Sequence, residues 1–332
     1  AFTIAGIELV SPLGGEAGMM TSSRVIASAA GGAGGLVKIE CSTNSGAAYQ
    51  LVTASYANFP WPTTNYYQWI VPPPPLSTYR IRVTSVADGA MFDSSPGDFA
   101  VTPTQHTLTV TSPYGAPIPS GVTLTNWGTL INASVDGSPH IDGLTQHVCI
   151  GWTGSGNVTG GAGTNTSFVL MTNSTLDWQW GTLFRLNCNA GPNGSIDHSP
   201  QWVQAGSNRV INAAPSNGHH FVDWTGDTNG CAVAGPQIIV PMTMGRVITA
   251  NFAIDTYTLT VVSPHGGEAP GTLLTNWGTP LSCRIVNSPV TGAGTQYVAN
   301  GGMVAGNNFT QVNPTNIALT LTNDATLTWT WK

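Results

Sequence analysis

The chain has 332 residues, 41% of them hydrophobic, which is enough to build more than one buried core. Only 7% of the residues are Asp, Glu, Lys or Arg, and a net charge of −6 excludes the basic surface that binding to nucleic-acid phosphates requires. Eleven Trp, nine Phe and eight Tyr residues exclude intrinsic disorder, while 40 Gly and 23 Pro indicate many turns and few helices.

The first unit, residues 1–104, alternates apolar and polar residues in short runs. Val37–Cys41 and Tyr79–Thr84 follow a period of two, which predicts strands with one buried face. Turn-forming clusters such as Pro72–Pro75 separate these runs.

The segment that precedes these runs is a candidate for strand addition. Ala1–Leu9 places apolar side chains at Phe2, Ile4 and Ile7. Such a strand can pair with the open sheet edge of a neighbouring molecule. Pairing within its own domain is an equally open alternative.

An internal repeat organises the rest of the chain, which matters because repeats of this length indicate tandem modules. Residues 105–181 and 256–332 contain the same four segments in the same order, about 150 positions apart. The matched segments are His106–Gly115 with Tyr257–Gly266, Leu124–Thr129 with Leu274–Thr279, Thr145–Val148 with Thr295–Val298, and Thr175–Trp180 with Thr326–Trp331.

Residues 182–255 separate the two copies and form a third kind of unit. Thr and Trp, which favour the pleated surface of a sheet, dominate the alternating runs throughout the chain. The sequence therefore predicts an all-β fold of tandem small antiparallel β-sandwich or immunoglobulin-like modules at residues 1–104, 105–181, 182–255 and 256–332.

Two of these units resemble known families of bacterial surface modules. The first is similar to Knh-like immunoglobulin-type N-terminal domains, through Ser11–Glu16, Val37–Thr43, Trp69–Pro72, Tyr79–Ser85 and Asp93–Phe99. The third resembles a divergent internalin-type B-repeat, through Ala213–Gly218, Phe221–Asp227 and Met242–Phe252. The second and fourth are similar to a related surface repeat that ends in Trp-x-Trp. The resemblance implies stalk, spacer or adhesive modules and brings no catalytic residues with it.

The five cysteines lack the spacing of a zinc site. Cys188 and Cys231 fall within one unit and are the best candidates for a disulfide, although buried free thiols are an equally open reading. The related surface repeat often carries two cysteines in each copy, whereas here one copy has Ala133 and Cys149 and the other has Cys283 and Ala299. One hypothesis is that Cys149 of one subunit meets Cys283 of another; the alternative is two independently buried thiols.

No constellation of residues indicates catalysis, a metal or a cofactor. Glycosidase chemistry needs two converging carboxylates, but Glu16, Asp93, Asp98 and Asp227 occupy turn positions of the resembled families. His219 and His220 are adjacent, so on a strand they point to opposite faces and do not share a metal ion.

The tryptophans allow two interpretations. Trp61, Trp152 and Trp202 are candidates for stacking on sugar rings. Trp127 and Trp277 occupy equivalent positions in the two copies, as do Trp178 and Trp329, and this recurrence favours core packing.

We expect a non-enzymatic structural protein, located outside the cell or at its surface, that associates with itself into a filament, sheath or layer. Low charge favours this function because neutral surfaces repel one another weakly. The alternatives are an adhesin or carbohydrate-binding stalk with glycans as partners, and the non-catalytic part of a larger secreted hydrolase. The chain opens without Met or a signal segment, which indicates a processed form, and contains no membrane span.

Overall fold

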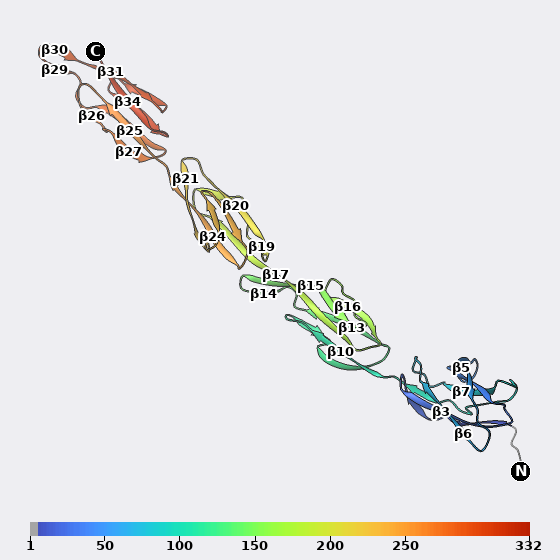
Figure 1. Cartoon of the computed structure of the whole chain (residues 1–332). Helices are drawn as coiled ribbons and strands as arrows, with labels where there is room; N and C mark the ends of the chain where they lie inside the picture. The colour runs from blue at the N-terminus through green and yellow to red at the C-terminus, as the bar shows by residue number, and fades with distance from the viewer. Residues whose placement is uncertain (1–5) are drawn as a thin grey trace. The chain divides into compact units, whose positions relative to one another are not determined.

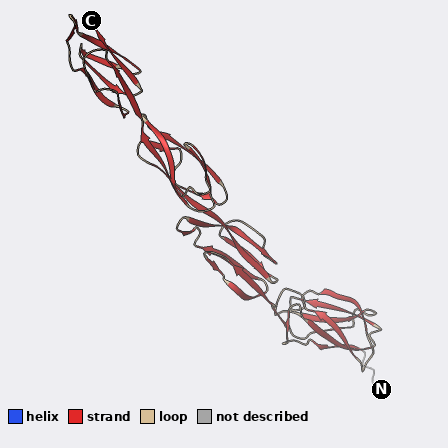
Figure 2. Cartoon of the chain, turned by 60° about the vertical axis from the view of Figure 1, so that its left-hand side comes forward, coloured by secondary structure: helices blue, strands red, loops and turns tan. Residues whose placement is uncertain are grey.

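The structure, a computed structural model, describes residues 6–332, and every regular element among them is a β-strand (Figures 1 and 2). The predicted all-β class of tandem sandwich modules is therefore confirmed. The buried apolar side chains form four separate clusters along the chain.

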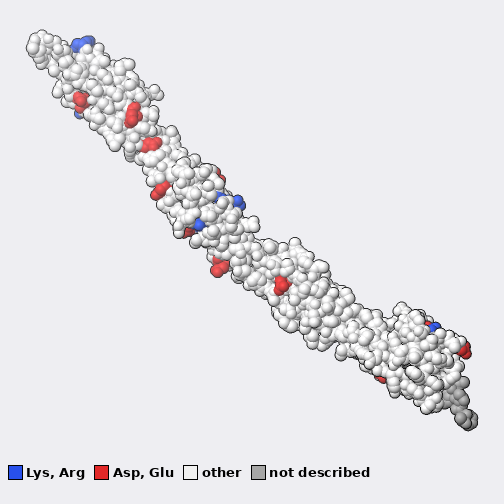
Figure 3. Space-filling model, in the orientation of Figure 1, with Lys and Arg blue, Asp and Glu red and all other residues white. Residues whose placement is uncertain are grey.

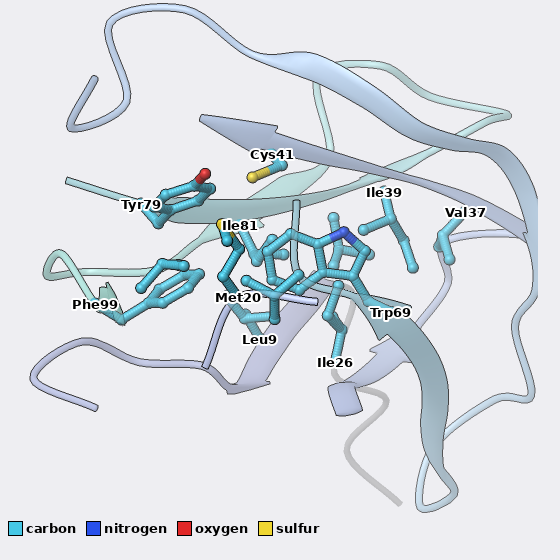
Figure 4. Close-up of a cluster of buried hydrophobic side chains, with 13 residues drawn as sticks. Leu9, Met20, Ile26, Val37, Ile39, Cys41, Trp69, Tyr79, Ile81 and Phe99 are labelled. Atoms are coloured by element: carbon cyan, nitrogen blue, oxygen red, sulfur yellow. The ribbon is translucent and has the colours of Figure 1, made fainter. Parts of the chain in front are cut away.

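The first module packs a three-stranded sheet, ordered β1-β3-β6, and a four-stranded sheet, ordered β5-β4-β7-β8, around one core. Trp69, Tyr79 and Phe99 lie together in that core, with ring centroids 5.7–6.5 Å apart (Figure 4). The strands are β1 (Gly6–Ser11), β2 (Ala17–Met19), β3 (Ser23–Gly31), β4 (Leu36–Ser42), β5 (Gln50–Ala57), β6 (Thr64–Ile70), β7 (Arg80–Ser85), β8 (Phe92–Ser94) and β9 (Ala100–Thr102).

The second module opposes a sheet that contains β12, β10, β17, β15 and β14 to a smaller sheet, ordered β11-β13-β16. Alternate residues of β17 are buried, including Leu176 and Trp178, as the period-two pattern predicts. Its strands are β10 (Gln105–Thr111), β11 (Ala116–Ile118), β12 (Gly121–Asn126), β13 (Thr129–Asp136), β14 (His140–Asp142), β15 (Thr145–Ser155), β16 (Asn165–Leu170) and β17 (Ser174–Ala190).

The fourth module repeats this architecture with sheets ordered β27-β25-β34-β31 and β26-β28-β33-β32. Val261 faces Leu327 in it as Val110 faces Leu176 in the second module. Its strands are β25 (Thr256–Val262), β26 (Glu268–Ala269), β27 (Leu273–Asn276), β28 (Thr279–Ile285), β29 (Val290–Gly292), β30 (Thr295–Tyr297), β31 (Ala299–Ala305), β32 (Phe309–Asn313), β33 (Asn316–Leu321) and β34 (Ala325–Trp331).

The third module combines the last residues of β17 with β19, β21 and β24, opposite a sheet ordered β18-β20-β23-β22. Its core includes Leu186, Trp224 and Ile248. The remaining strands are β18 (Gly194–Ile196), β19 (Gln201–Gln204), β20 (Asn208–Pro215), β21 (His219–Gly226), β22 (Ala232–Ala234), β23 (Gln237–Pro241) and β24 (Arg246–Ile254).

Several strand pairs are parallel instead of antiparallel as predicted, among them β2–β9 of the first module. The first and last strands of the second, third and fourth modules pair in parallel, as β10–β17, β17–β24 and β25–β34. Parallel strands point the same way, so the chain leaves each of these modules at the end opposite to its entry. This topology suits tandem modules, and β17 is both the last strand of one module and the first of the next.

The chain divides into two compact units. The first contains residues up to Ser138 together with Cys149–Trp180, and the second contains Pro139–Val148 and Gly181–Lys332. The hairpin Pro139–Val148 therefore belongs to the unit of the third module, although its sequence lies within the second.

Candidate functional site

The recurring tryptophans divide into two structural classes. Trp178 and Trp329 are 2% exposed and lie in the cores of the second and fourth modules, as predicted. Trp127 and Trp277 are only half-buried and lie outside the cores of their own modules. The interpretation of this second pair as core residues is therefore wrong.

Trp127 and Trp277 instead contact the module that precedes each of them. Trp127 packs against the core cluster of the first module, and its backbone amide donates to the carbonyl oxygen of Thr104 at 2.8 Å. The Trp277 amide donates in the same way to Asp255, at the equivalent position, at 2.8 Å. Both tryptophans lie in an Asn-Trp-Gly-Thr turn between two strands of their own module.

The joint between the third and fourth modules is tightly packed. Gly218 lies against the Trp277 indole so closely that a Cβ atom there would overlap the ring. The Gly218 carbonyl accepts a hydrogen bond of 2.9 Å from the Asp255 amide, and the Asp255 carboxylate lies 2.7 Å from Nδ1 of His220. We call Gly218, His220, Asp255 and Trp277 the Trp277 joint.

We expect Gly218→Ala to destabilise this joint more than Gly230→Ala does. Both glycines have a left-handed backbone, with φ of +73° and +76°, so both substitutions carry a strain of about 1–2 kcal/mol. Only alanine at 218 also collides with an indole ring, which adds about 1–3 kcal/mol to the loss in the free energy of unfolding. Denaturant titration of both variants measures the difference.

The Trp277→Ala background serves as the control for this comparison. Removing the ring removes the collision, so the two glycine substitutions should then have equal cost. Equal costs in the presence of Trp277 would show that the joint is not a packed contact.

The three candidate sugar-stacking tryptophans have different environments. Trp61 is 50% exposed in a loop of the first module. Trp152 packs edge-on against Trp178, with centroids 5.6 Å apart, and its Nε1 donates to the Thr159 carbonyl at 2.8 Å. Trp202 is half-buried beneath Arg185 in the third module. Of the three, Trp61 is exposed and the other two are half-buried.

The loop that carries Trp61 is held by buried amide side chains. Asn65 is 5% exposed; its Oδ1 accepts from the Phe59 amide at 2.9 Å, and its Nδ2 donates to Oδ1 of Asn58 at 3.0 Å. The backbone of the loop is therefore fixed, while the Phe59 side chain is 62% exposed beside Trp61 in the sequence.

The carboxylates assigned to turns accept structural hydrogen bonds. Glu16 accepts from the amides of Leu13 and Gly14 at 2.8 and 2.6 Å. Burial raises the pKa of Glu16, but these amide hydrogen bonds outweigh it and leave the pKa below its usual range. Asp93 accepts from the Leu9 amide at 2.7 Å, which ties the start of the first module to its last strands.

Asp98 has a similar structural role. Its carboxylate accepts from Nε of Arg80 at 2.6 Å and from the Ser45 hydroxyl at 2.7 Å. The Arg80 hydrogen bond, followed by that of Ser45, lowers the pKa of Asp98.

Asp227 begins a turn in the third module whose backbone carbonyl oxygens bind the guanidinium group of Arg246. Arg246 is 4% exposed, and its Nη1 donates to the carbonyl oxygens of Asp227 and Asn229 at 2.7 and 2.8 Å. The Asp227 carboxylate accepts from the Val247 amide at 2.8 Å. The always-charged guanidinium of Arg246 thus organises this turn through its backbone carbonyl oxygens. Among residues 6–332, no three His, Cys, Asp or Glu side chains are grouped to bind a metal ion.

The candidate disulfide residues lie against the same core. Cys188 is buried and Cys231 is half-buried in the third module, and both are free thiols in the structure. Burial, together with the nearby Cys231, raises the pKa of Cys188 to about 11. A disulfide between them stays a prediction.

The candidate intersubunit thiols are both deeply buried. Cys149 lies in the core of the second module, where its Sγ is 3.5 Å from the Gly163 carbonyl oxygen, and Cys283 is 0% exposed in the core of the fourth. A bond between Cys149 of one subunit and Cys283 of another would require both cores to open. This pairing also stays a prediction.

We expect Cys41 and Cys188 of the folded chain to resist alkylation at pH 8. Burial raises the pKa of Cys41 to about 12 and that of Cys188 to about 11. At pH 8 the reactive thiolate is then about one part in 10,000 for Cys41 and one in 1,000 for Cys188. Timed iodoacetamide labelling followed by peptide mass spectrometry measures each site.

Labelling of the unfolded, unreduced chain provides the control. All cysteines that are not bridged should react there, so a protected pair of Cys188 and Cys231 peptides would identify that disulfide. Labelling of Cys41 at the same rate in the folded and unfolded chains would contradict its burial.

Of the three candidate strand-donor residues, only Ile7 lies among the residues that the structure describes. Phe2 and Ile4 lie outside the described residues. Ile7 lies in β1, which pairs antiparallel with β3 in its own module, and it faces Ala30. Ile7 is therefore paired within its own module, and strand addition by Phe2 and Ile4 stays a prediction.

Sequence reasoning missed Gly218 and Arg246. The Asn-Gly dipeptide at 217–218 signals a turn, but nothing local indicates that an indole from another module covers it. Arg246 is an isolated basic residue, and only the fold brings two carbonyl oxygens of a distant turn to it.

Comparison with known proteins agrees with part of this picture. Residues 184–256 match the family model of the divergent InlB B-repeat domain, which confirms the resemblance of the third module. No curated protein and no solved structure matches the chain. The similarity of the first module to Knh-like domains stays a prediction.

InlB-type B-repeat domains belong to bacterial surface proteins, so the match indicates a surface-protein repeat region. The family match and the all-β fold together point to a non-catalytic surface module. Among residues 6–332, no helix is long and apolar enough to cross a membrane.

Proposed function

We propose that the chain is a non-enzymatic extracellular structural protein that associates with itself into a filament, sheath or layer. The observation that carries this proposal is the Trp277 joint together with its counterpart at Trp127. The tryptophans that recur in the two copies attach one module to the next. A binding protein would instead present such aromatic residues to a ligand.

The surface supports the same function. On the face drawn in Figure 3, charged side chains are isolated spots on a neutral surface. Exposed strand residues such as Val122, Leu124 and Leu274, between 61% and 70% exposed, lie on β12 and β27. Each of these strands is at the edge of its sheet, where unpaired backbone groups are available to another chain. Weak electrostatic repulsion allows such edges to approach closely.

We propose N-terminal strand addition as the mechanism of association. Deleting residues 1–5 should leave every described strand intact, because β1 begins at Gly6. The truncated chain should keep the circular dichroism spectrum and melting temperature of the full chain but form no polymers in negative-stain electron microscopy.

The double substitution Phe2→Ser and Ile4→Ser is the matched variant, because it keeps the length and removes the apolar side chains. If the full chain and the truncated chain both form fibres, strand addition is the wrong mechanism.

The exposed loop at residues 58–62 favours glycan binding as a second candidate function. The proposal rests on the two exposed aromatic rings of Phe59 and Trp61 and on the backbone that Asn65 fixes beneath them. A chain with this function would be an adhesin or a carbohydrate-binding stalk of a larger secreted protein.

Trp61→Ala should abolish glycan-array binding if this loop is the site. The reason is that a sugar ring would bind there mainly by stacking on the exposed aromatic face of Trp61. Leu51→Ala is the control, since Leu51 is 61% exposed on β5 of the same module, outside the loop that carries Trp61. Binding that is lost equally in both variants, or in neither, would contradict a site at Trp61.

A further inference from the structure

The edges of the sheets differ in how far they are protected against pairing with another chain. An edge strand carries a row of unpaired backbone groups, and natural proteins usually shorten, bend or block it. In β6 the carbonyl oxygen of Tyr66 already accepts from the Tyr56 hydroxyl at 2.6 Å. A break in register interrupts β1, β5, β21, β31 and β32, and two to four residues make up β2, β8, β9, β11, β14, β18, β19, β22, β26, β27, β29 and β30. Among the described edge strands, only β12 and β16 keep six residues in regular pairing.

These two edges differ in their outward side chains. β16 presents Asn165 and Ser167, which are exposed and polar. β12 presents Val122 and Leu124, which are 70% and 61% exposed, and it contains no charged residue and no Pro. Covering apolar side chains removes them from water, whereas covering polar ones costs their hydration. A partner strand therefore stabilises β12 more than β16.

The equivalent edge of the fourth module is shortened. Thr272 stands at the position of Val122, and its hydroxyl accepts from the Val261 amide at 3.3 Å. β27 accordingly begins at Leu273 and has four residues, whereas β12 pairs with β10 over six. The long apolar edge thus belongs to one copy of the repeat, although Leu124 and Leu274 are equivalent and similarly exposed.

β12 is complementary to itself when two copies of it run antiparallel. Residues that oppose each other in antiparallel strands lie on the same face of the sheet. A two-fold axis at Thr123 therefore places Val122 of each copy opposite Leu124 of the other, which gives two apolar pairs on the outward face. Thr123 faces Thr123 on the other face, and Thr–Thr pairs stabilise neighbouring strands.

The surroundings of β12 lack charge, as a two-fold contact requires. Near such an axis each charged group would lie close to its own copy, and like charges repel across an interface. Neither β12 nor its neighbour β10 contains Asp, Glu, Lys or Arg. Asp177 of the same sheet lies on β17, which β10 separates from β12. Two copies can therefore approach at this edge without burying an unpaired charge.

We propose that β12 pairs antiparallel with β12 of a second copy of this chain, about a two-fold axis at Thr123. This inference rests on the proposed self-association and adds a contact that is separate from N-terminal strand addition. Both copies use the same surface, so the contact joins chains in pairs and does not by itself extend a polymer. Its role is to link filaments to one another, which a sheath or layer requires.

The register is tested with full chains that carry Val122→Cys mixed with full chains that carry Leu124→Cys. Mild oxidation should form a disulfide between positions 122 and 124, detected by mass spectrometry of peptides digested without reduction. Each variant alone should form far less, because equal positions lie diagonally across the axis. Val122→Cys mixed with Leu274→Cys is the control and should not link. A bond between positions 122 and 274 in place of 122 and 124 would overturn β12 as the occupant.

Leu124→Lys tests the consequence for assembly. Leu124 is 61% exposed, so the melting temperature should not change. A lysine on an edge strand obstructs pairing with another chain, and we expect filaments that no longer associate with one another in negative-stain electron microscopy. Leu274→Lys, at the equivalent position of the fourth module and 68% exposed, is the matched control and should assemble as the unchanged chain does. Equal assembly of the two lysine variants would contradict a contact at β12.

The outcomes separate this contact from the proposed mechanism of polymerisation. If the full chain polymerises without a bond between positions 122 and 124, pairing of β12 is wrong while strand addition stands. If that bond forms in chains that make no filaments, strand addition is wrong while pairing of β12 stands. If neither filaments nor the bond form, both are wrong.

Discussion

The structure depends on the burial of alternate side chains between two small sheets. Each module has few strands in each layer, so large residues such as Trp178 and Trp329 must supply much of the apolar area. Their indole Nε1 atoms are buried without a hydrogen-bond partner, which indicates that apolar packing dominates at these positions. The outward residues that alternate with the buried ones in β34 are threonines, so this face of the strand is polar and uncharged.

The first and last strands of the second, third and fourth modules pair in parallel, so the chain enters each of these modules at one end and leaves it at the other. The tryptophans of the Asn-Trp-Gly-Thr turns then attach each repeated module to its predecessor. At the Trp277 joint this attachment combines the indole ring against Gly218 with a hydrogen bond from the Trp277 amide to the carbonyl oxygen of Asp255.

Several charged side chains also stabilise the fold by holding turns. Glu16, Asp93 and Asp98 hold turns in the first module, and Arg246 organises a turn in the third by donating to two carbonyl oxygens. These groups are engaged in maintaining the fold. The surfaces that offer recognition are the backbone edges of the sheets and the exposed aromatic loop of the first module.

Much of this architecture follows from the sequence alone. The period-two runs determined the strands, and the four repeated segments revealed two equivalent modules, because both signals are local in the chain. Only the tertiary structure decided which side chains from distant parts of the chain contact one another. Trp127 and Trp178 both recur with the repeat, yet one joins modules and the other fills a core, since their roles depend on which neighbour covers each ring. Likewise the hairpins at 140–147 and 290–297 pair in the same register, but only the fold shows that the first lies beside β17, because that contact joins residues far apart in the chain.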